Sequence, residues 1–250
     1  MNEKTNLYYC IASLIALLLN LPASFLKPLL PTDIYAQSLQ GTLWKGQAQS
    51  VRYQGKPLGA VNWKILPACF SSLSLCAAIK QQGPSLQSEF ILHGSRHWHF
   101  TDLTAEGDMK HFANHFKKYR ITPRGRFTLD LNELQFAHGE LLSARGRIEI
   151  KPMWLISVMR LSLGDIHAEI EPAINAEQGS LMQISNRQGH LDLEGQVQIT
   201  PELSYESHFT LTPNDNSNRS VKRILRYLRG YQNNGEVQLS YQGQLALTAD

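Results

Sequence analysis

The side chains of this 250-residue chain that are best suited to redox or metal chemistry are its three cysteines and nine histidines. Cys69 and Cys76 lie close together in the sequence, whereas Cys10 lies in an apolar run near the N-terminus. In an oxidising compartment Cys69 and Cys76 are expected to form a local disulfide. In a reducing compartment they would be buried thiols, which pack as small apolar side chains. The spacing of the cysteines does not fit a Cys-x-x-Cys zinc motif.

Two groups of histidines have a spacing that suits metal binding. His111 and His115 are four residues apart, so on a helix they would share one face. The residues between them, Phe112-Ala113-Asn114, lack the glutamate of zinc hydrolases. The second group is His93, His97 and His99, of which the last two would share one side of a strand. No carboxylate cluster accompanies either group, so the sequence predicts no metal site and no cofactor.

Signatures of catalysis are missing from the sequence as well. The segment His93-Gly94-Ser95-Arg96-His97 lacks the second glycine of a nucleophile elbow, and no phosphate-binding loop or dinucleotide fingerprint occurs. The central acidic residues fall on alternating polar positions or in turns, as on solvated strand faces: Asp130, Glu133, Glu140, Asp192 and Glu194. We therefore predict no catalytic residue and a protein that is not an enzyme; a hydrolase is the least favoured class.

Composition places the chain among folded proteins with lightly charged surfaces. Charged residues make up 18% of the sequence, below the typical value of about 25%. A net charge of +3 and a pI near 8.7 are too small to predict nucleic-acid binding, which needs a concentrated basic face. Without its N-terminal segment the chain keeps roughly 220 residues, enough for one large β domain or two small ones.

An uncharged segment at residues 5–26 is the strongest hydropathy feature. A membrane-spanning helix needs about 20 apolar residues, so we expect a leader at 1–6, a transmembrane anchor at 7–26 and a connecting segment at 27–40. A cleaved signal peptide is a less favoured alternative because no Ala-x-Ala site follows the apolar run directly. A buried core helix is the third alternative. A short leader before an apolar run usually sends the following chain across the membrane.

Alternation of apolar and polar residues recurs through residues 41–250 and predicts an all-β domain. Two of the apolar sets are Phe127, Leu129 and Leu131, and Leu191, Leu193, Val197 and Ile199. Strict alternation indicates antiparallel strands with one buried and one solvated face. Turn residues such as Asn233-Asn234-Gly235 separate the runs.

Two short helices are expected among the strands, at residues 109–119 and 220–229. In the second, an apolar face lies opposite a basic one; the apolar residues are Val221, Ile224, Leu225 and Leu228. We expect the apolar face to pack on the sheet, with the basic face in water. Binding of the basic face to an anionic membrane surface is the alternative.

One element of the sequence resembles a known family. Gly41-Thr42-Leu43-Trp44-Lys45-Gly46-Gln47-Ala48 is followed by Trp63-Lys64-Ile65-Leu66-Pro67. This is similar to the N protein of bacterial type II secretion systems (the general secretion pathway protein N family), which has Gly-Thr-Leu-Trp-small-Gly-x-Ala and then Trp-x-hydrophobic-x-Pro. Lys45 stands where the family has a small residue. The resemblance continues through residues 123–129 and reaches the C-terminal part of the chain.

The matching residues form a structural motif: Gly41, Thr42, Leu43, Trp44, Gly46, Trp63 and Pro67. Gly41 and Gly46 would bracket a tight strand. We expect Trp44 and Trp63 to stack across neighbouring strands as core anchors. Glycine, threonine, leucine and tryptophan offer no acid–base chemistry, so the motif is expected to shape the sheet.

The resemblance implies a single-pass inner-membrane protein of a Gram-negative bacterium, with residues 41–250 in the periplasm. The implied fold is a long, twisted and curled antiparallel sheet, like a β-groove or jelly roll. The implied role is a non-enzymatic accessory or assembly component that supports export of folded proteins across the outer membrane. Its expected partners are other inner-membrane and periplasmic components of the secretion machine. A periplasmic lipid-binding or lipid-transfer protein is the alternative; an open apolar lining of the sheet would favour it, and a filled lining would favour the assembly role.

Overall fold

The computed structural model describes most of the chain between residue 16 and residue 245. The described residues are 8, 13–14, 16–30, 32–67, 69, 74–83, 86–94, 98–117, 120–157, 160–173, 179–217 and 219–245. The strands and helices among them are η1 (Ala23–Leu29), β1 (Ile34–Gly41), β2 (Lys45–Tyr53), β3 (Lys56–Leu66), β4 (Leu75–Gln82), β5 (Leu86–Gly94), β6 (Trp98–Asp108), η3 (Met109–Phe112), α2 (Ala113–Phe116), β7 (Thr122–Ala137), β8 (Glu140–Ile156), β9 (Arg160–Pro172), β10 (Ser180–Arg187), β11 (Leu191–Ile199), β12 (Ser204–Pro213), α3 (Arg219–Leu225) and β13 (Val237–Gln244).

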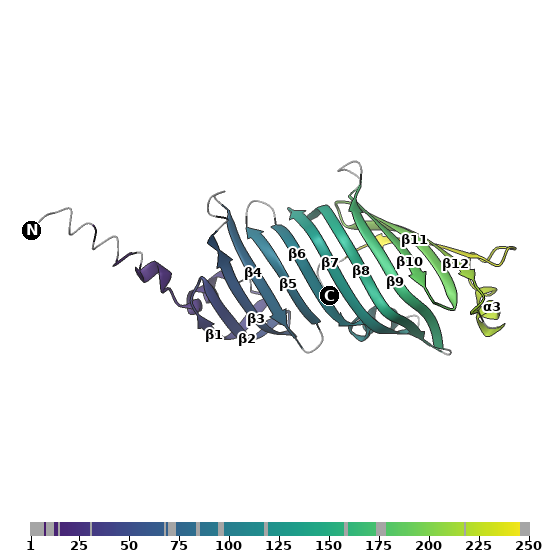
Figure 1. Cartoon of the computed structure of the whole chain (residues 1–250), viewed down its shortest axis with the longest axis horizontal. Helices are drawn as coiled ribbons and strands as arrows, with labels where there is room; N and C mark the ends of the chain where they lie inside the picture. The colour runs from purple at the N-terminus through teal and green to yellow at the C-terminus, as the bar shows by residue number, and fades with distance from the viewer. Residues whose placement is uncertain are drawn as a thin grey trace, which may run out of the picture. The chain divides into compact units, whose positions relative to one another are not determined.

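The fold is all-β and antiparallel, which confirms the prediction from alternation. The described residues form thirteen strands, and their hydrogen-bonded order is their order along the chain (Figure 1). Each strand therefore follows its neighbour without a crossover; η3 and α2 lie in the β6–β7 connection, and α3 lies in the β12–β13 connection. In the β7–β8 connection His138 has φ 53° and Gly139 has φ 87°. Two successive left-handed residues form the turn whose twist matches that of the strands it joins.

The chain divides into two compact units, residues 1–93 and residues 94–250. The first unit holds β1 to β5. Its apolar cluster is built from the buried side chains of Ala36, Ala48 and Val51, with Leu58 and Trp63 packed against them. These residues come from the first three strands, so the N-terminal hairpins of this unit share one small core.

In the second unit the register sorts residues onto two faces. Across β7 to β11 one row of paired residues is polar: Asp130, Arg147, Glu169, Gln183 and Gln196. The next row is nearly all apolar: Leu131, Gly146, Ile170, Met182 and Val197. Because successive residues of a strand point to opposite sides, the first row defines a polar face and the second row an apolar face.

Segments of the second unit itself cover parts of the apolar face. Val221 and Leu225 of α3 pack with the buried Leu191 and Val237, as the amphipathic pattern predicted. Leu228, which was predicted on the same face, lies beyond α3 and is exposed. Leu203, in the turn between β11 and β12, joins a separate cluster that includes Leu131, Leu141 and Ile170. In addition, the backbone N–H of Leu141 donates to the carbonyl of Pro201 at 2.8 Å. The unit therefore bends far enough to bring this turn onto β8, which is not its sheet neighbour.

Both predicted helices differ from the structure in extent. The region predicted as a helix at 109–119 is a 3₁₀ turn, η3, followed by one turn of α-helix, α2. The Asp108 carboxylate accepts a hydrogen bond from the backbone N–H of Lys110 at 2.8 Å, and this bond lowers the pKa of Asp108. The second helix, α3, ends at Leu225, earlier than the predicted residue 229.

Six residues of the predicted anchor at 7–26 lie outside the described residues, namely 7, 9–12 and 15. Residues 16–19 are helical, and the Asn20 side chain donates to the carbonyl of Ala16 at 2.8 Å. The prediction of a helix to residue 26 is wrong at this end: Pro22 forms an isolated bridge with Thr42, and Ala23–Leu29 is a 3₁₀ helix. Proline has no backbone N–H to continue the α-helical pattern. Among the described residues, no helix combines the length and apolar character needed to cross a bilayer.

Gly164 in β9 provides a test of the sheet's close packing. Its φ is +71°, and a Cβ there would collide with the carbonyl oxygen of Arg187. Gly139 has a similar φ of +87° with open space around it. We expect Gly164→Ala to destabilise the chain by about 3 kcal/mol and Gly139→Ala by about 1 kcal/mol. Thermal melts of the full-length variants would measure this; equal losses would contradict the close approach of β9 and β10.

Candidate functional site

The family-like motif lies in the first unit, where the connection between β1 and β2 meets the N-terminal segment. The backbone N–H of Leu43 donates to the carbonyl of Leu21 at 2.8 Å. The indole N–H of Trp44 donates to the carbonyl of Leu18, also at 2.8 Å. Thr42 pairs with Pro22 in the isolated bridge. The motif therefore ties the end of the N-terminal segment to the first hairpin of the sheet.

The two motif tryptophans have different environments. Trp44 lies in the connection before β2, whereas Trp63 lies in β3, where its register partner is Gly46. The Trp63 indole N–H donates to the carbonyl of Leu43 at 3.1 Å, and a Cβ on Gly46 would collide with the Trp63 ring. The register therefore explains why residue 46 is a glycine, because the Trp63 indole occupies the space that a side chain at residue 46 would need.

A hollow of about 560 Å³ opens beside this motif. Its lining includes Gly41, Gly46, Trp63, Ile79 and Glu89. The remaining motif residue, Pro67, follows the end of β3 and is exposed. All of these residues belong to the first unit, so the motif shapes one local surface.

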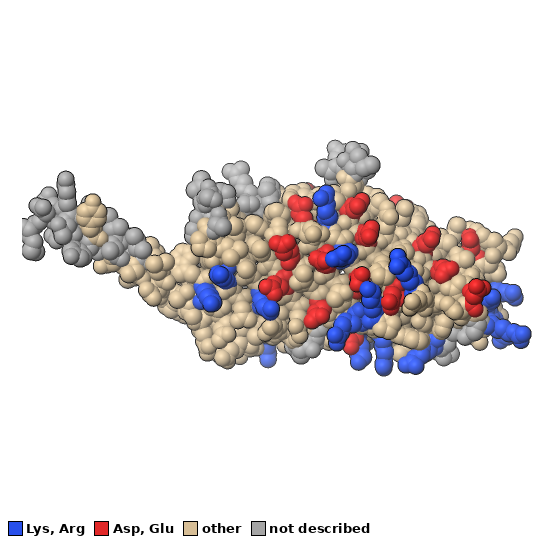
Figure 2. Space-filling view, viewed as in Figure 1, with Lys and Arg blue, Asp and Glu red and all other residues tan. Residues whose placement is uncertain are grey.

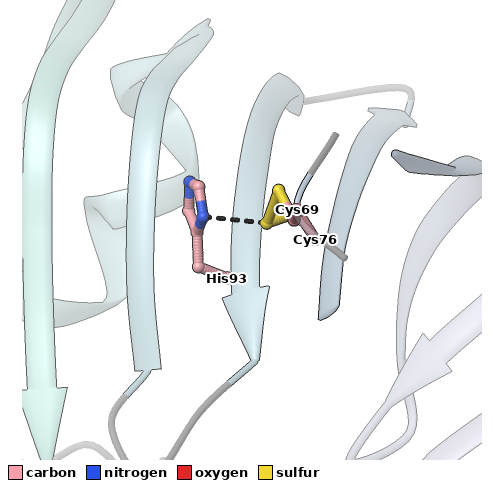
Figure 3. Close-up of side chains that lie close together, drawn as sticks. All are labelled: Cys69, Cys76 and His93. Atoms are coloured by element: carbon pink, nitrogen blue, oxygen red, sulfur yellow. Dashed lines mark hydrogen bonds between the residues drawn. A yellow bond between two sulfur atoms is a disulfide. The ribbon is translucent and has the colours of Figure 1, made fainter. Parts of the chain in front are cut away.

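Cys69 and Cys76 are joined by a disulfide with an S–S distance of 2.03 Å (Figure 3). Cys76 is 0% exposed. The Nδ1 atom of His93, on β5, lies 3.0 Å from the Cys76 sulfur. The structure thus brings together three side chains that offer sulfur and nitrogen donors.

The sequence grouped His93 with His97 and His99 and missed its contact with the cysteines. Local alternation cannot show which strand lies opposite. The sequence signal that could have revealed the contact is a pair of opposite charges on the two strands of one hairpin. In the structure Lys80 Nζ of β4 lies 3.1 Å from Glu89 Oε2 of β5. Four residues before Lys80 stands Cys76, and four residues after Glu89 stands His93.

The other histidines that were considered for a metal site are not brought together in the described residues. His111 lies in η3 and is exposed, whereas His115 lies in α2 and its side chain is outside the described set. His97 is also outside it. His99 Nε2 lies 3.5 Å from Glu133 Oε1.

The polar face of the second unit carries charged residues that pair with one another. Arg147 Nη2 lies 2.7 Å from Asp130 Oδ2. Glu149 contacts Lys151 at 2.7 Å and His167 at 3.3 Å, and the hydrogen bond from Lys151 lowers the pKa of Glu149. Figure 2 shows acidic and basic side chains interspersed on the face turned to the viewer.

This polar face is hollowed over β9 to β13. The hollow has a volume of about 750 Å³, and its lining includes His167, Glu169, Glu194, Gln196, His208 and Thr210. Glu169, Glu194 and His208 are exposed. Such a wide, open and polar surface suits contact with another polar macromolecule better than enclosure of a small apolar ligand.

Comparison with known proteins confirms the resemblance seen in the sequence. Residues 33–240 match the family described as type II secretion system (T2SS), protein N. A curated relative, the type II secretion system protein N of Vibrio cholerae serotype O1 (strain ATCC 39315 / El Tor Inaba N16961), is 44% identical over 52 residues. That segment covers 20% of this chain and 21% of the relative's length. No solved structure matches the chain.

Substitutions of Trp63 and Lys45 test the prediction that the motif shapes the sheet. Trp63→Ala removes packing on Gly46 and the bond to Leu43, and we expect it to cost about 3 kcal/mol. Lys45 is exposed and its register partner is Lys64. Lys45→Ser relieves a like-charge pair and should change stability by less than about 0.5 kcal/mol. Thermal melts of the full-length chain compare the two; unchanged stability of Trp63→Ala would contradict a packing role.

The disulfide predicts the labelling behaviour of the thiols. In a Cys10→Ser background, the native chain should resist alkylation until a reductant is added. The closed loop is short, so the entropic stabilisation is only about 2–3 kcal/mol. Mass spectrometry after alkylation measures the outcome, and two labelled thiols in the unreduced native protein would contradict the bond.

Proposed function

Because the chain belongs to the protein N family of the type II secretion system, we propose that it is a non-enzymatic accessory component of that machine. In this role it supports export of folded proteins across the outer membrane. The observation that carries the proposal is the polar face of the second unit, which is wide, hollowed and rich in exposed polar side chains. A surface of this kind can hold partner proteins without performing chemistry on them.

We also propose the topology that the sequence indicated, with the apolar N-terminal segment in the inner membrane and the chain after it in the periplasm. Two observations support it. The motif holds the carbonyls of Leu18 and Leu21 against the first hairpin, which would fix the sheet close to the membrane exit. The bond between Cys69 and Cys76 suits an oxidising compartment.

The filling of the apolar face favours assembly over lipid carriage. Val221 and Leu225 are each 2% exposed and pack on strand residues. Two residues from connections between strands also pack on this face. Leu203 joins the cluster of Leu131, Leu141 and Ile170, and Met109 packs against the cluster of Met153, Leu163 and Ile166. A lipid would have to compete with these side chains for the same apolar surface.

A secretion assay tests the proposal. Deleting the gene should lower release of type II substrates while their folding in the periplasm stays normal. Complementation with Glu169→Lys plus Glu194→Lys, both exposed at the hollow, should restore protein level without restoring secretion. Glu140→Lys, exposed beside the β7–β8 turn, is the matched control and should restore both.

Two outcomes would contradict the assignment. Normal secretion in the deletion strain, together with altered outer-membrane permeability, would favour lipid carriage. Full secretion with the charge-reversed hollow would show that partners bind elsewhere on the chain.

A further inference from the structure

The contact between His93 and the disulfide places a nitrogen donor beside the two sulfur atoms. A disulfide needs no third donor, yet a half-buried imidazole directs its Nδ1 at a fully buried sulfur, 3.0 Å away (Figure 3). One ligand atom from each of Cys69, Cys76 and His93 lies within 4.8 Å of the others. The three side chains thus form a compact set of two sulfur donors and one nitrogen donor.

The dimensions of this set are close to those of a zinc site. With Zn–S near 2.3 Å and Zn–N near 2.0 Å, ligand atoms around a tetrahedral zinc ion lie about 3.5–3.8 Å apart. The distance of 3.0 Å from the Cys76 sulfur to His93 Nδ1 and the upper limit of 4.8 Å within the set bracket this spacing. Reduction of the disulfide would leave the two sulfur atoms free to move apart to the spacing that a zinc ion needs.

We propose that Cys69, Cys76 and His93 form a redox-gated binding site for a thiophilic divalent cation of the zinc class. The disulfide form does not bind the metal, because the ligand is a negatively charged thiolate and neither sulfur of a disulfide carries that charge. The dithiol form is open. Three protein ligands leave the fourth tetrahedral position to water.

The exchange between the two forms balances with a dithiol as reductant. The reductant's two thiols become its own disulfide, and two electrons and two protons pass to Cys69 and Cys76, which become thiols. The metal ion then displaces those two protons and binds two thiolates and the His93 imidazole. Oxidation of the two thiolates to the disulfide by a partner disulfide reverses the sequence and releases the ion.

The surrounding hydrogen bonds would hold the three side chains together after reduction. The Cys69 carbonyl accepts hydrogen bonds from both the backbone N–H and the hydroxyl of Ser74, each at 3.2 Å. On the other side, the pair between Lys80 and Glu89 joins β4 to β5. Neither contact involves a sulfur atom, so the reduced thiols stay close to His93 without the covalent bond.

Cobalt binding to the full-length chain tests the proposal, in a Cys10→Ser background that removes the third thiol. Under anaerobic conditions with a phosphine reductant, the chain should bind one equivalent of Co²⁺. The expected spectrum has a sulfur-to-cobalt charge-transfer band and the intense visible bands of a tetrahedral ion, and Zn²⁺ should abolish both. The oxidised chain should show neither band.

Variants separate the site from adventitious binding. His93→Ala should weaken binding at least as much as loss of an outer partner weakens a metal site, about 10–100-fold. Cys76→Ser should lower the charge-transfer intensity and the affinity together. His111→Ala, which changes an exposed histidine in the second unit, is the control and should match the parent chain.

Several results would overturn the proposal. These are equal Co²⁺ binding by the oxidised and reduced chains, a reduced chain without the charge-transfer band, and unweakened binding by His93→Ala. Far-UV circular dichroism shows whether the reduced chain remains folded. Loss of its strand signal that Co²⁺ does not restore would also overturn the proposal.

Discussion

Backbone hydrogen bonding between consecutive antiparallel strands is the interaction on which the rest of this structure depends. Within each ladder it fixes which residues lie opposite one another, and the two-residue period then fixes the face on which each side chain lies. In the second unit this places Asp130 and Glu169 on the polar face, and Leu131 and Ile170 on the apolar face. A slip of one residue would exchange the two faces.

The strands could be predicted because alternation is a local property. The runs around Phe127 and Leu191 needed no knowledge of their neighbours. The 3₁₀ geometry of Met109–Phe112 was missed because the helical period of apolar residues does not distinguish 3₁₀ from α-helical turns. The place of Trp63 over Gly46 and the contact of His93 with Cys76 depend on register between strands, which no single run of residues contains.

The same strand register explains the structural role of the motif residues. Gly46 leaves room for the Trp63 indole, which in turn bonds to the Leu43 carbonyl. Leu43 and Trp44 then hold the N-terminal segment through Leu21 and Leu18. The motif therefore fixes the end of the N-terminal segment to the first hairpin of the sheet through backbone and indole hydrogen bonds.

The most direct test of the account is photocross-linking from two residues of β12. His208 is exposed at the polar hollow, whereas Leu211 packs against the apolar cluster of Leu191, Val221, Leu225 and Val237. Benzoylphenylalanine replaces each residue in turn in living cells. The account predicts protein adducts from position 208 that disappear when the other secretion components are absent, and few or none from position 211. Adducts from position 211 alone, or lipid adducts there, would contradict it.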